Sequence, residues 1–253
     1  HSIFLFDSLL LQIFVQSFLN NPLEGNINSE RLISMMSVVN DELVIEEKGI
    51  YSIEKFLTAR RLMYWQVYLH KTSLVAEQMI TRILKRAKEL THKGVKLEAS
   101  SALSFFLNNS TNSNNFEIST LNQFSLLDDY DIMSALKSWQ FHDDFVLSHL
   151  SEMILNRNLL KIKLRNKAFS SSKLEAVKKD VMLEYKLDTH EASYFVFHGH
   201  VDNLAYNPKQ GGLKILYKNG NTKDIIKASD HLSSKVLSKT VSKHYICFPK
   251  DIL

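Results

Sequence analysis

The sequence predicts a mainly α-helical protein, with a helical lobe over residues 1–157 and a small α+β lobe with a mostly antiparallel sheet over residues 158–253. Three observations support this class. The 253-residue chain has only 7 Gly and 3 Pro. Roughly its first 160 residues are dominated by long segments of helical period. After Asn158 the pattern changes to short alternating runs separated by turn signals.

In the first lobe, apolar residues recur at helical spacing. The apolar run at the N-terminus is interrupted by Asp7 and Gln12 below membrane-spanning length, so we expect a buried helix rather than a membrane segment. The polar stretch "NNSTNSNN" (108–115) cannot bury a face and predicts a surface loop. The expected helices are 3–20, 28–39, 50–69 continuing to about 91, 98–108, 119–124, 129–139 and 143–156.

The C-terminal lobe reads as alternating strands and helices. "LLKIKLR" alternates like a strand, "SSSKLEAVKKDVMLEYKL" predicts a capped helix, and "SYFVFHG" predicts a second strand. The Asn-Gly pair in "LKILYKNGNTKDII" indicates a tight hairpin. A helix near 229–241 and a last strand, "HYICF", complete the expected order.

Charge and cysteine content narrow the functional classes. A formal net charge of +4 is too mild for a dedicated nucleic-acid binder, although it allows local basic pockets for anionic ligands. The single cysteine, Cys247, excludes an internal disulfide and any zinc site made of several cysteines. A chain of this kind fits the reducing cytoplasm, where we expect this protein to act.

The segment "IEKFLTARRLMYWQVYLHKTSLVAEQMI" (53–80) carries the main functional signal. At 100° per residue, Arg60 lies in the middle of an apolar stripe, with Tyr64 and Tyr68 one and two turns further on and Lys71 back on the same side. The stripe itself consists of Ile53, Phe56, Leu57, Met63, Val67 and Leu74.

A guanidinium on an apolar face needs an anionic partner, because an uncompensated buried charge costs several kcal/mol. Two interpretations of Arg60 follow from the pattern alone. It forms a buried ion pair with a carboxylate of the protein, or it binds a phosphate, whose oxygens match the guanidinium fork. A tyrosine one turn away could then flank a sugar or a base.

Several runs of the chain resemble a known family. "EGNINSERLISMM" and the following "VIEEKGIYSIEKFLTARRLMYWQVYLHKTSLVAEQMITRILKRA" are similar to the C-terminal half of HD-domain phosphohydrolases. That group includes bacterial dNTP triphosphohydrolases and the SAM-and-HD-domain dNTPase of animals. The shared features are an E-K-G turn, a helix with T-A-R and then Y-x-H-K. "FSLLDDYDIMSALKSW" and the hairpin-helix-strand ending "LKILYKNGNTKDIIKASDHLSSKVLSKTVSKHYICFPK" match as well.

The resemblance assigns candidate site residues. Arg60 falls where the family places an arginine on the substrate triphosphate, and Tyr68 where a tyrosine packs against the deoxyribose. Tyr64 falls where some members have a histidine near the substrate. For an activating nucleotide held between subunits, the implied residues are Arg31, Lys48 and Lys71. Glu46 stands where the animal enzyme has a basic residue. For Arg31, Lys48 and Lys71, an exposed and solvated charge without a bound nucleotide is an equal interpretation.

The resemblance also implies a divalent metal (Mg, Mn, Fe or Zn), held in the family by His, a His-Asp pair and a later Asp. The segment before "EGNI" has no such motif, so we expect no catalytic or metal-binding residue in this chain and expect the complete protein to be longer. A His-Asp pair occurs far downstream, at His142 and Asp143, and is followed by Asp144. We interpret these three residues as the start of a helix, with the carboxylates at its positive end.

Three functions follow for comparison. The first is an enzyme, a homo-oligomer (dimer or tetramer) that hydrolyses a dNTP of dGTP type to a deoxynucleoside and triphosphate. The second is a non-catalytic module that senses nucleotides and mediates oligomerisation. The third is nucleic-acid binding through 159–179, which lacks an aromatic stacking set and is the weakest. We expect no membrane partner.

One further pattern suggests metal binding. His198, His200 and Asp202 follow each other at the period of one strand face, a spacing that could place three ligands together. Histidines at a strand edge are more often structural or simply exposed, and this interpretation remains open alongside the metal site.

Overall fold

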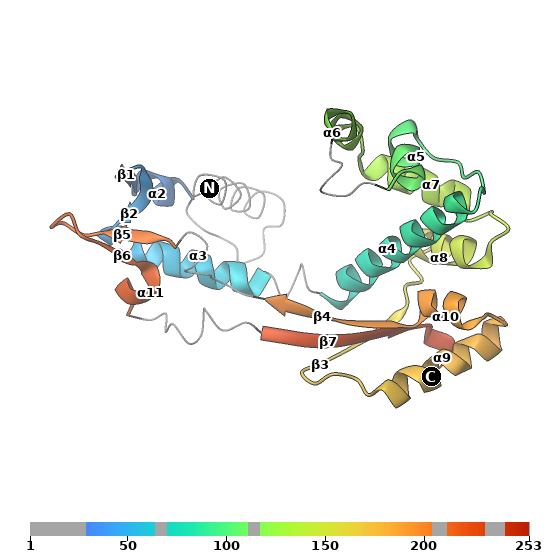
Figure 1. Ribbon diagram of the computed structural model, residues 1–253. Coiled ribbons are helices and arrows are strands. Elements are labelled where there is room, and N and C mark those ends of the chain that lie inside the picture. The colour runs from blue at the N-terminus through green and yellow to red at the C-terminus, as the bar shows by residue number, and fades with distance from the viewer. Residues whose placement is uncertain (1–28, 64–69, 111–116, 204–211, 231–240, 253) are drawn as a thin grey trace. The chain divides into compact units, whose positions relative to one another are not determined.

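The computed structural model describes residues 29–63, 70–110, 117–203, 212–230 and 241–252 (Figure 1). These residues form two compact units, residues 1–70 with 200–243 and residues 71–199 with 244–253. The units differ from the expected sequential division after residue 157, because strands distant in the sequence pair with each other in each unit. Helices predominate and the accompanying sheets are small and mostly antiparallel, which confirms the predicted fold class.

The first unit combines a four-stranded sheet with helix α3 (Ile50–Met63). The strands are β1 (Met36–Val39), β2 (Glu42–Glu46), β5 (Lys214–Leu216) and β6 (Thr222–Asp224), in the order β1-β2-β5-β6. β1 and β2 are antiparallel, β2 and β5 are parallel, and β5 and β6 are antiparallel. The short helices α2 (Ser29–Ser34), η2 (Glu47–Gly49) and α11 (Ile225–Ala228) complete the described part of this unit.

A single apolar cluster holds these elements together. It contains residues from α2, β2, α3, β5 and α11, so it joins the two sequence segments of the unit. Burying such side chains removes apolar surface from water, which is the main favourable term in folding. The cluster consists of Leu32, Met35, Ile45, Ile53, Phe56, Leu57, Ala59, Ile215 and Ile225.

The predicted helix over 28–39 is wrong in its second half. The chain leaves the helix after Ser34 and forms a hairpin from β1 and β2. Asn40 and Asp41 both have positive φ, at 51° and 61°, which is the backbone of a two-residue type I′ turn. The alternating "MSVV" and "ELVIE" on each side of Asn-Asp contained this signal, and helical spacing of Leu32, Met35 and Met36 masked it.

The second unit is built around the long helix α4 (Lys71–His92), which packs against α8 (Phe145–Leu155) and α5 (Ser101–Asn108) (Figure 1). α7 (Asp129–Trp139) also packs against α8, and α6 (Ile118–Ser125) contacts α5. α7 begins where the sequence predicts, because Asp128 and Asp131 form a reciprocal capping box. The buried residues of α4 recur at helical spacing and are Leu74, Val75, Met79, Ile83, Arg86, Ala87 and Leu90.

A three-stranded sheet and two helices complete the second unit. The strands β3 (Lys161–Arg165), β7 (Val241–Phe248) and β4 (Phe197–Asn203) lie in the order β3-β7-β4, and β3 and β7 are antiparallel. Residues 200–203 of β4 and 241–243 of β7 are counted with the first unit. The helices are α9 (Ser171–Tyr185) and α10 (Thr189–Phe195), followed at the end of the chain by η5 (Lys250–Ile252).

Three other expectations need correction or fall outside the described residues. The expected continuous helix over 50–91 is two helices, because α3 ends at Met63 and His70 precedes α4 without helical structure. The expected strand "SYFVFHG" begins later, since its first residues close α10. The expected helix 3–20, and most of the one near 229–241, lie outside the described residues. In the described residues, no helix is long and apolar enough to cross a membrane.

Candidate functional site

Helix α3 presents its apolar face to the core of the first unit. Ile53, Phe56 and Leu57 are 0 %, 0 % and 1 % exposed. Gly49, just before the helix, allows this close packing, because a Cβ there would lie 2.7 Å from Cγ2 of Ile45. Arg60 continues the same face one turn later and is half-buried.

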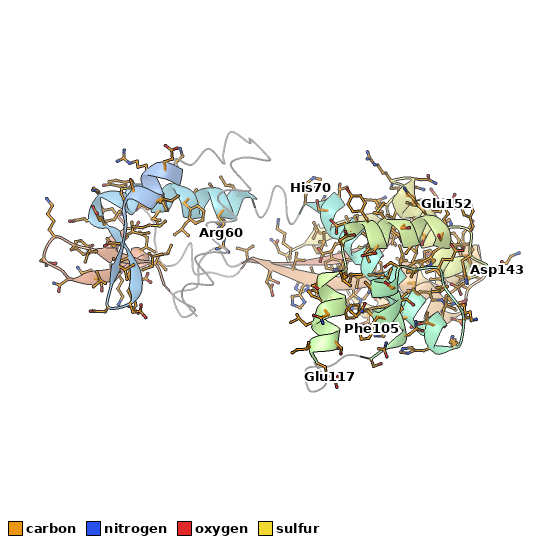
Figure 2. All side chains as sticks on the ribbon, turned by 90° about the horizontal axis from the view of Figure 1, so that it is seen from above. Arg60, His70, Phe105, Glu117, Asp143 and Glu152 are labelled. Atoms are coloured by element: carbon orange, nitrogen blue, oxygen red, sulfur yellow. The ribbon has the colours of Figure 1, made fainter. Side chains whose placement is uncertain are left out.

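Arg60 lies in the last turn of α3 (Figure 2), whereas the sequence placed it inside one longer helix. The buried side chains of Ile53, Phe56 and Leu57 confirm the first part of the predicted stripe. Leu74 and Lys71, which the prediction placed on the same helix, belong to α4. The role of Arg60 stays a prediction. The other two members of the predicted substrate site, Tyr64 and Tyr68, lie outside the described residues.

A buried carboxylate on α3 was missed by the sequence interpretation. Glu54 is 7 % exposed and accepts a hydrogen bond from the hydroxyl of Ser229. Ser229 follows α11, whose N-terminus is capped by the Asp224 carboxylate through the N–H of Ile226. This contact connects two segments of the first unit that are distant in the sequence. Glu54 sits next to the apolar stripe, and only its tertiary partner distinguishes it from a surface residue.

The three predicted effector residues are all exposed. Arg31 lies on α2, Lys48 on η2 and Lys71 at the start of α4. Lys48 Nζ lies 2.7 Å from Oε2 of Glu46. Both side chains of this pair are largely solvated, so it contributes little to stability. Arg31 and Lys48 belong to the first unit and Lys71 to the second, so no common site of the three is described.

The His-Asp letters at 142–144 have a structural role, as predicted. The Asp144 carboxylate caps α8 by accepting from the N–H of Leu147 at 2.9 Å, and His142 Nδ1 accepts from the N–H of Asp144 at 2.9 Å. The same carboxylate receives two charge-assisted bonds from Arg86 on α4, from Nε to Oδ1 at 3.1 Å and from Nη2 to Oδ2 at 2.6 Å. These atoms fix the start of α8 on α4.

Arg86 is the centre of a polar cluster that the sequence interpretation did not find. Its side chain is 5 % exposed and also lies 3.2 Å from Oε1 of Glu191 and 3.5 Å from Oε2 of Glu89. His190 Nε2 lies 3.0 Å from Glu89 Oε2, and the Tyr194 hydroxyl donates to the other oxygen of Glu89. The cluster joins α4, α8 and α10, and its atoms partner one another.

The pKa values of this cluster follow from its contacts. Burial raises the pKa of Asp144, but the hydrogen bonds from Arg86 and Leu147 outweigh burial and leave this pKa below its ordinary value. Burial likewise raises the pKa of Glu89, and hydrogen bonds from Tyr194 and His190 reverse the effect. The hydrogen bond to Asp144 raises the pKa of Arg86. All three groups are therefore charged at neutral pH.

The His198, His200 and Asp202 pattern does not form a metal site. All three side chains are exposed on β4, and His200 Nε2 lies 3.6 Å from Oδ2 of Asp202. Across the described residues, no group of three His, Cys, Asp or Glu side chains is arranged to hold a metal ion. The donor set needed for a catalytic metal is thus not assembled by the described part of this chain.

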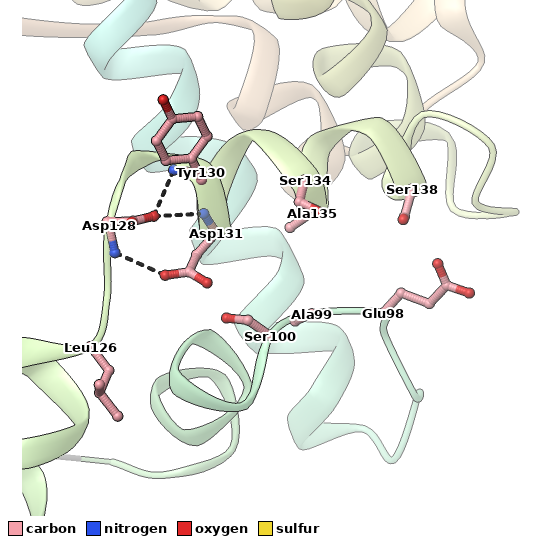
Figure 3. A pocket seen from close by; sticks show the side chains of 10 residues that line it. All are labelled: Glu98, Ala99, Ser100, Leu126, Asp128, Tyr130, Asp131, Ser134, Ala135 and Ser138. Carbon is pink, nitrogen blue, oxygen red and sulfur yellow. Dashed lines mark hydrogen bonds between the residues drawn. The ribbon is translucent and has the colours of Figure 1, made fainter.

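An open pocket of about 550 Å³ lies between α7 and the segment before α5 (Figure 3). Its wall carries the carboxylates of Glu98, Asp128 and Asp131. A hydrogen bond from Ser100, together with the Asp128 backbone N–H, lowers the pKa of Asp131, so its carboxylate is ionised at neutral pH. A wall with these negative charges repels a triphosphate, and this pocket is therefore unsuited to a nucleotide.

Comparison with known proteins identifies the central segment. Residues 27–115 match the family model described as the HD associated region. This segment includes α3 with Arg60 and all of α4. The chain is related to the HD-domain superfamily. The HD associated region also contains Arg31, Lys48 and Lys71, whereas β3 to β7 lie beyond it.

Solved structures extend the likeness beyond the HD associated region. A phosphohydrolase from Bacteroides thetaiotaomicron is 46 % identical, with a TM-score of 0.82, and the match covers 90 % of this chain and 57 % of that protein. A hypothetical protein from Aquifex aeolicus is 20 % identical, with a TM-score of 0.55 over 97 % of this chain and 53 % of that protein, and shares the fold.

A curated relative of this chain comes from Bacillus subtilis. The uncharacterized protein YwfO is 26 % identical over 237 residues, which cover 90 % of this chain and 52 % of YwfO. This chain thus spans little more than half the length of the relatives it matches.

Proposed function

We propose that the complete protein is an HD-type phosphohydrolase that hydrolyses a dNTP, of dGTP type, to a deoxynucleoside and triphosphate. The observation that carries this proposal is the half-buried Arg60 guanidinium, which continues the core-facing stripe of α3 inside the HD associated region. The likeness to a phosphohydrolase over 90 % of this chain supports the reaction class.

In this proposal Arg60 binds the triphosphate through its guanidinium fork. A partly desolvated arginine interacts strongly with phosphate oxygens, because solvent screens the attraction less than at an exposed site. Tyr68 packs against the deoxyribose, where its phenol ring excludes the additional hydroxyl of a ribonucleotide, and Tyr64 lies near the substrate. A divalent metal would come with ligands from outside this chain, and we assign no step through it.

The test uses the full-length protein and separates substrate binding from folding. Arg60→Ala should lower dGTP hydrolysis by at least a hundredfold while the circular dichroism spectrum is unchanged, because a charge-assisted contact with the reacting triphosphate is lost. Lys55→Ala, which removes an exposed positive charge from the same helix, is the matched control. Chromatography of the products distinguishes triphosphate release from pyrophosphate release. Full activity in Arg60→Ala, or release of pyrophosphate, would contradict the proposal.

A second function, nucleotide sensing coupled to oligomerisation, is favoured by the exposure of Arg31, Lys48 and Lys71. An anionic effector or a second subunit can reach exposed basic side chains from solvent. Sedimentation of the full-length protein with and without dGTP tests this function. We expect dGTP to shift a monomer toward a dimer or tetramer, and the triple alanine variant to lose the shift. An unchanged sedimentation coefficient in the wild type would exclude it.

A further inference from the structure

Helix α7 is apolar on two opposite sides. Its buried residues, Ala135, Leu136 and Trp139, face the core of the second unit, where α7 packs against α8. At about 100° per residue, Tyr130 and Met133 lie on the other side of the helix, where they are 83 % and 39 % exposed. A surface helix needs one apolar face to join its core, so the fold of this unit does not explain the outward apolar residues.

The outward apolar residues continue beyond both ends of α7. Leu126, before the helix, is 64 % exposed, and Phe141, after it, is 83 % exposed. Leu126 and Tyr130 line the open pocket described above (Figure 3), and Phe141 lines a second open pocket, of about 580 Å³. Ser138 borders both pockets, so they adjoin along α7. We define the α7 stripe as the exposed residues Leu126, Tyr130, Met133, Ser134, Lys137 and Phe141.

The α7 stripe is symmetric along the chain. Its centre falls between positions 133 and 134, and Tyr130 and Lys137 are equally far from this centre, as are Leu126 and Phe141. When two copies of a helix pack antiparallel across a two-fold axis, residues equally far from the axis face each other. Spacings of three and four residues keep the stripe on the seam between two packed helices. The stripe is therefore suited to pair with itself.

The chemistry of the facing positions is complementary. In such a pair Leu126 would meet the ring of Phe141, and the ammonium of Lys137 would meet the ring of Tyr130, a favourable contact between a cation and an aromatic ring. Asp129, exposed beside Tyr130, would bring a carboxylate near the same lysine. Neither Asp129 nor Lys137 forms an ion pair with another residue in the described part of the chain. Antiparallel pairing also brings the acidic start of one α7 to the basic end of the other.

We propose that the α7 stripe binds the α7 stripe of a second copy of this chain, antiparallel across a two-fold axis. One pair of helices with its flanking residues is smaller than a standard interface of roughly 800 Å² per partner, so the association is weak and the protein is monomeric when dilute. The contact needs no nucleotide and uses none of Arg31, Lys48 and Lys71. It thus goes beyond the functions proposed above.

The first test follows the sedimentation of the full-length protein without nucleotide over a range of concentrations. We expect the wild type to dimerise as the concentration rises. Tyr130→Lys should weaken the dimer by about tenfold or more, because like charges then face each other across the axis. Leu183→Lys is the matched control, since Leu183 lies on α9 and is 79 % exposed. A wild type that stays monomeric, or an equal effect of the two lysine variants, would overturn the proposal.

A charge exchange tests the antiparallel register. Lys137→Glu should weaken the dimer, because glutamate then lies near Asp129 of the second copy. Adding Asp129→Lys to this variant restores the attraction with the signs reversed, and we expect it to recover most of the dimer. The circular dichroism spectrum checks that each variant keeps its helices. A double variant that dimerises no better than Lys137→Glu alone would refute the register.

Cross-linking locates the two-fold axis. Ser134 is exposed next to the centre of the α7 stripe, so a short bismaleimide should join two copies of Ser134→Cys. The native Cys247 is 0 % exposed and is protected from the reagent. Ser172→Cys, an exposed position on α9, measures cross-linking by random collision. Equal yields of cross-linked dimer from the two cysteine variants would show that α7 is not the contact, whether the stripe is covered by another part of the full-length protein or by a different protein.

Discussion

Replacing Arg86 by methionine should destabilise the second unit strongly. The arginine is 5 % exposed and makes bidentate bonds to Asp144, whose side chain is 14 % exposed. Methionine is also an unbranched chain, so the main effect is a carboxylate that is buried without its cation. Removing one partner of a buried ion pair costs about 3–5 kcal/mol.

The structure places the expected value near the lower end of that range. Asp144 keeps its bond from the N–H of Leu147 at 2.9 Å, which continues to stabilise the carboxylate. Glu89 and Glu191 are 35 % and 30 % exposed and can be hydrated, so losing their contacts adds less than about 1 kcal/mol each. We therefore expect a loss of about 3 kcal/mol in the free energy of unfolding, which is about 150-fold in the unfolding equilibrium constant.

Urea unfolding monitored by Trp139 fluorescence measures this change. Trp139 is 1 % exposed, its indole N–H donates to the Glu98 carbonyl at 2.9 Å, and the other tryptophan, Trp65, is removed by Trp65→Phe in every variant. Lys85→Met is the control, because this neighbouring cation is exposed. Adding Asp144→Asn to the arginine variant should recover part of the loss, since asparagine can still cap α8. A loss below about 1 kcal/mol in Arg86→Met would refute the reasoning.

Two further predictions concern acid stability and packing. The lowered pKa values of Asp144 and Glu89 mean that their contribution is complete above the ordinary values of 3.8 and 4.5 and is lost as the pH falls through the folded-state values. Urea unfolding at pH 7 and pH 3 should therefore show a steeper acid loss in the wild type than in Asp144→Asn, and equal slopes would contradict this linkage. Gly49→Ala should lower the free energy of unfolding by about 1–3 kcal/mol, because the new Cβ would lie 2.7 Å from Ile45 Cγ2 and 3.4 Å from Met35 Sδ. Melting followed by circular dichroism, with Ser52→Ala as the control on α3, tests this prediction, and an unchanged melting temperature would refute it.

The candidate site was predictable in part. Helical spacing from Ile53 to Arg60 predicted the core-facing stripe of α3, and the described structure confirms it. In the cluster around Arg86 only the pair with Glu89, three residues later on α4, is local. The other carboxylates, Asp144 and Glu191, come from two distant segments and were not predictable. In the sequence each of these residues is an isolated charge, and no local pattern indicates that they meet.

The sequence by itself determined the features that depend on neighbours a few residues away. The capping box from Asp128 to Asp131 and the turn at Asn219-Gly220 are of this kind, because their hydrogen bonds and backbone angles are local. Asn40-Asp41 shows the limit: two residues in the left-handed region were outweighed by an apparent helical spacing.

Only the tertiary structure decided which segments belong together. The hairpin strand β5 joins the first unit by pairing in parallel with β2, with Val44 opposite Lys214, and α10 joins the second unit through the Arg86 cluster. Such pairings depend on burial of shared apolar faces and on charges neutralised across elements, which are properties of the assembled core rather than of any short sequence. For the same reason, the sequence could indicate an anionic partner for Arg60, whereas the stacking of Arg82 on Phe197 is visible only in the folded unit.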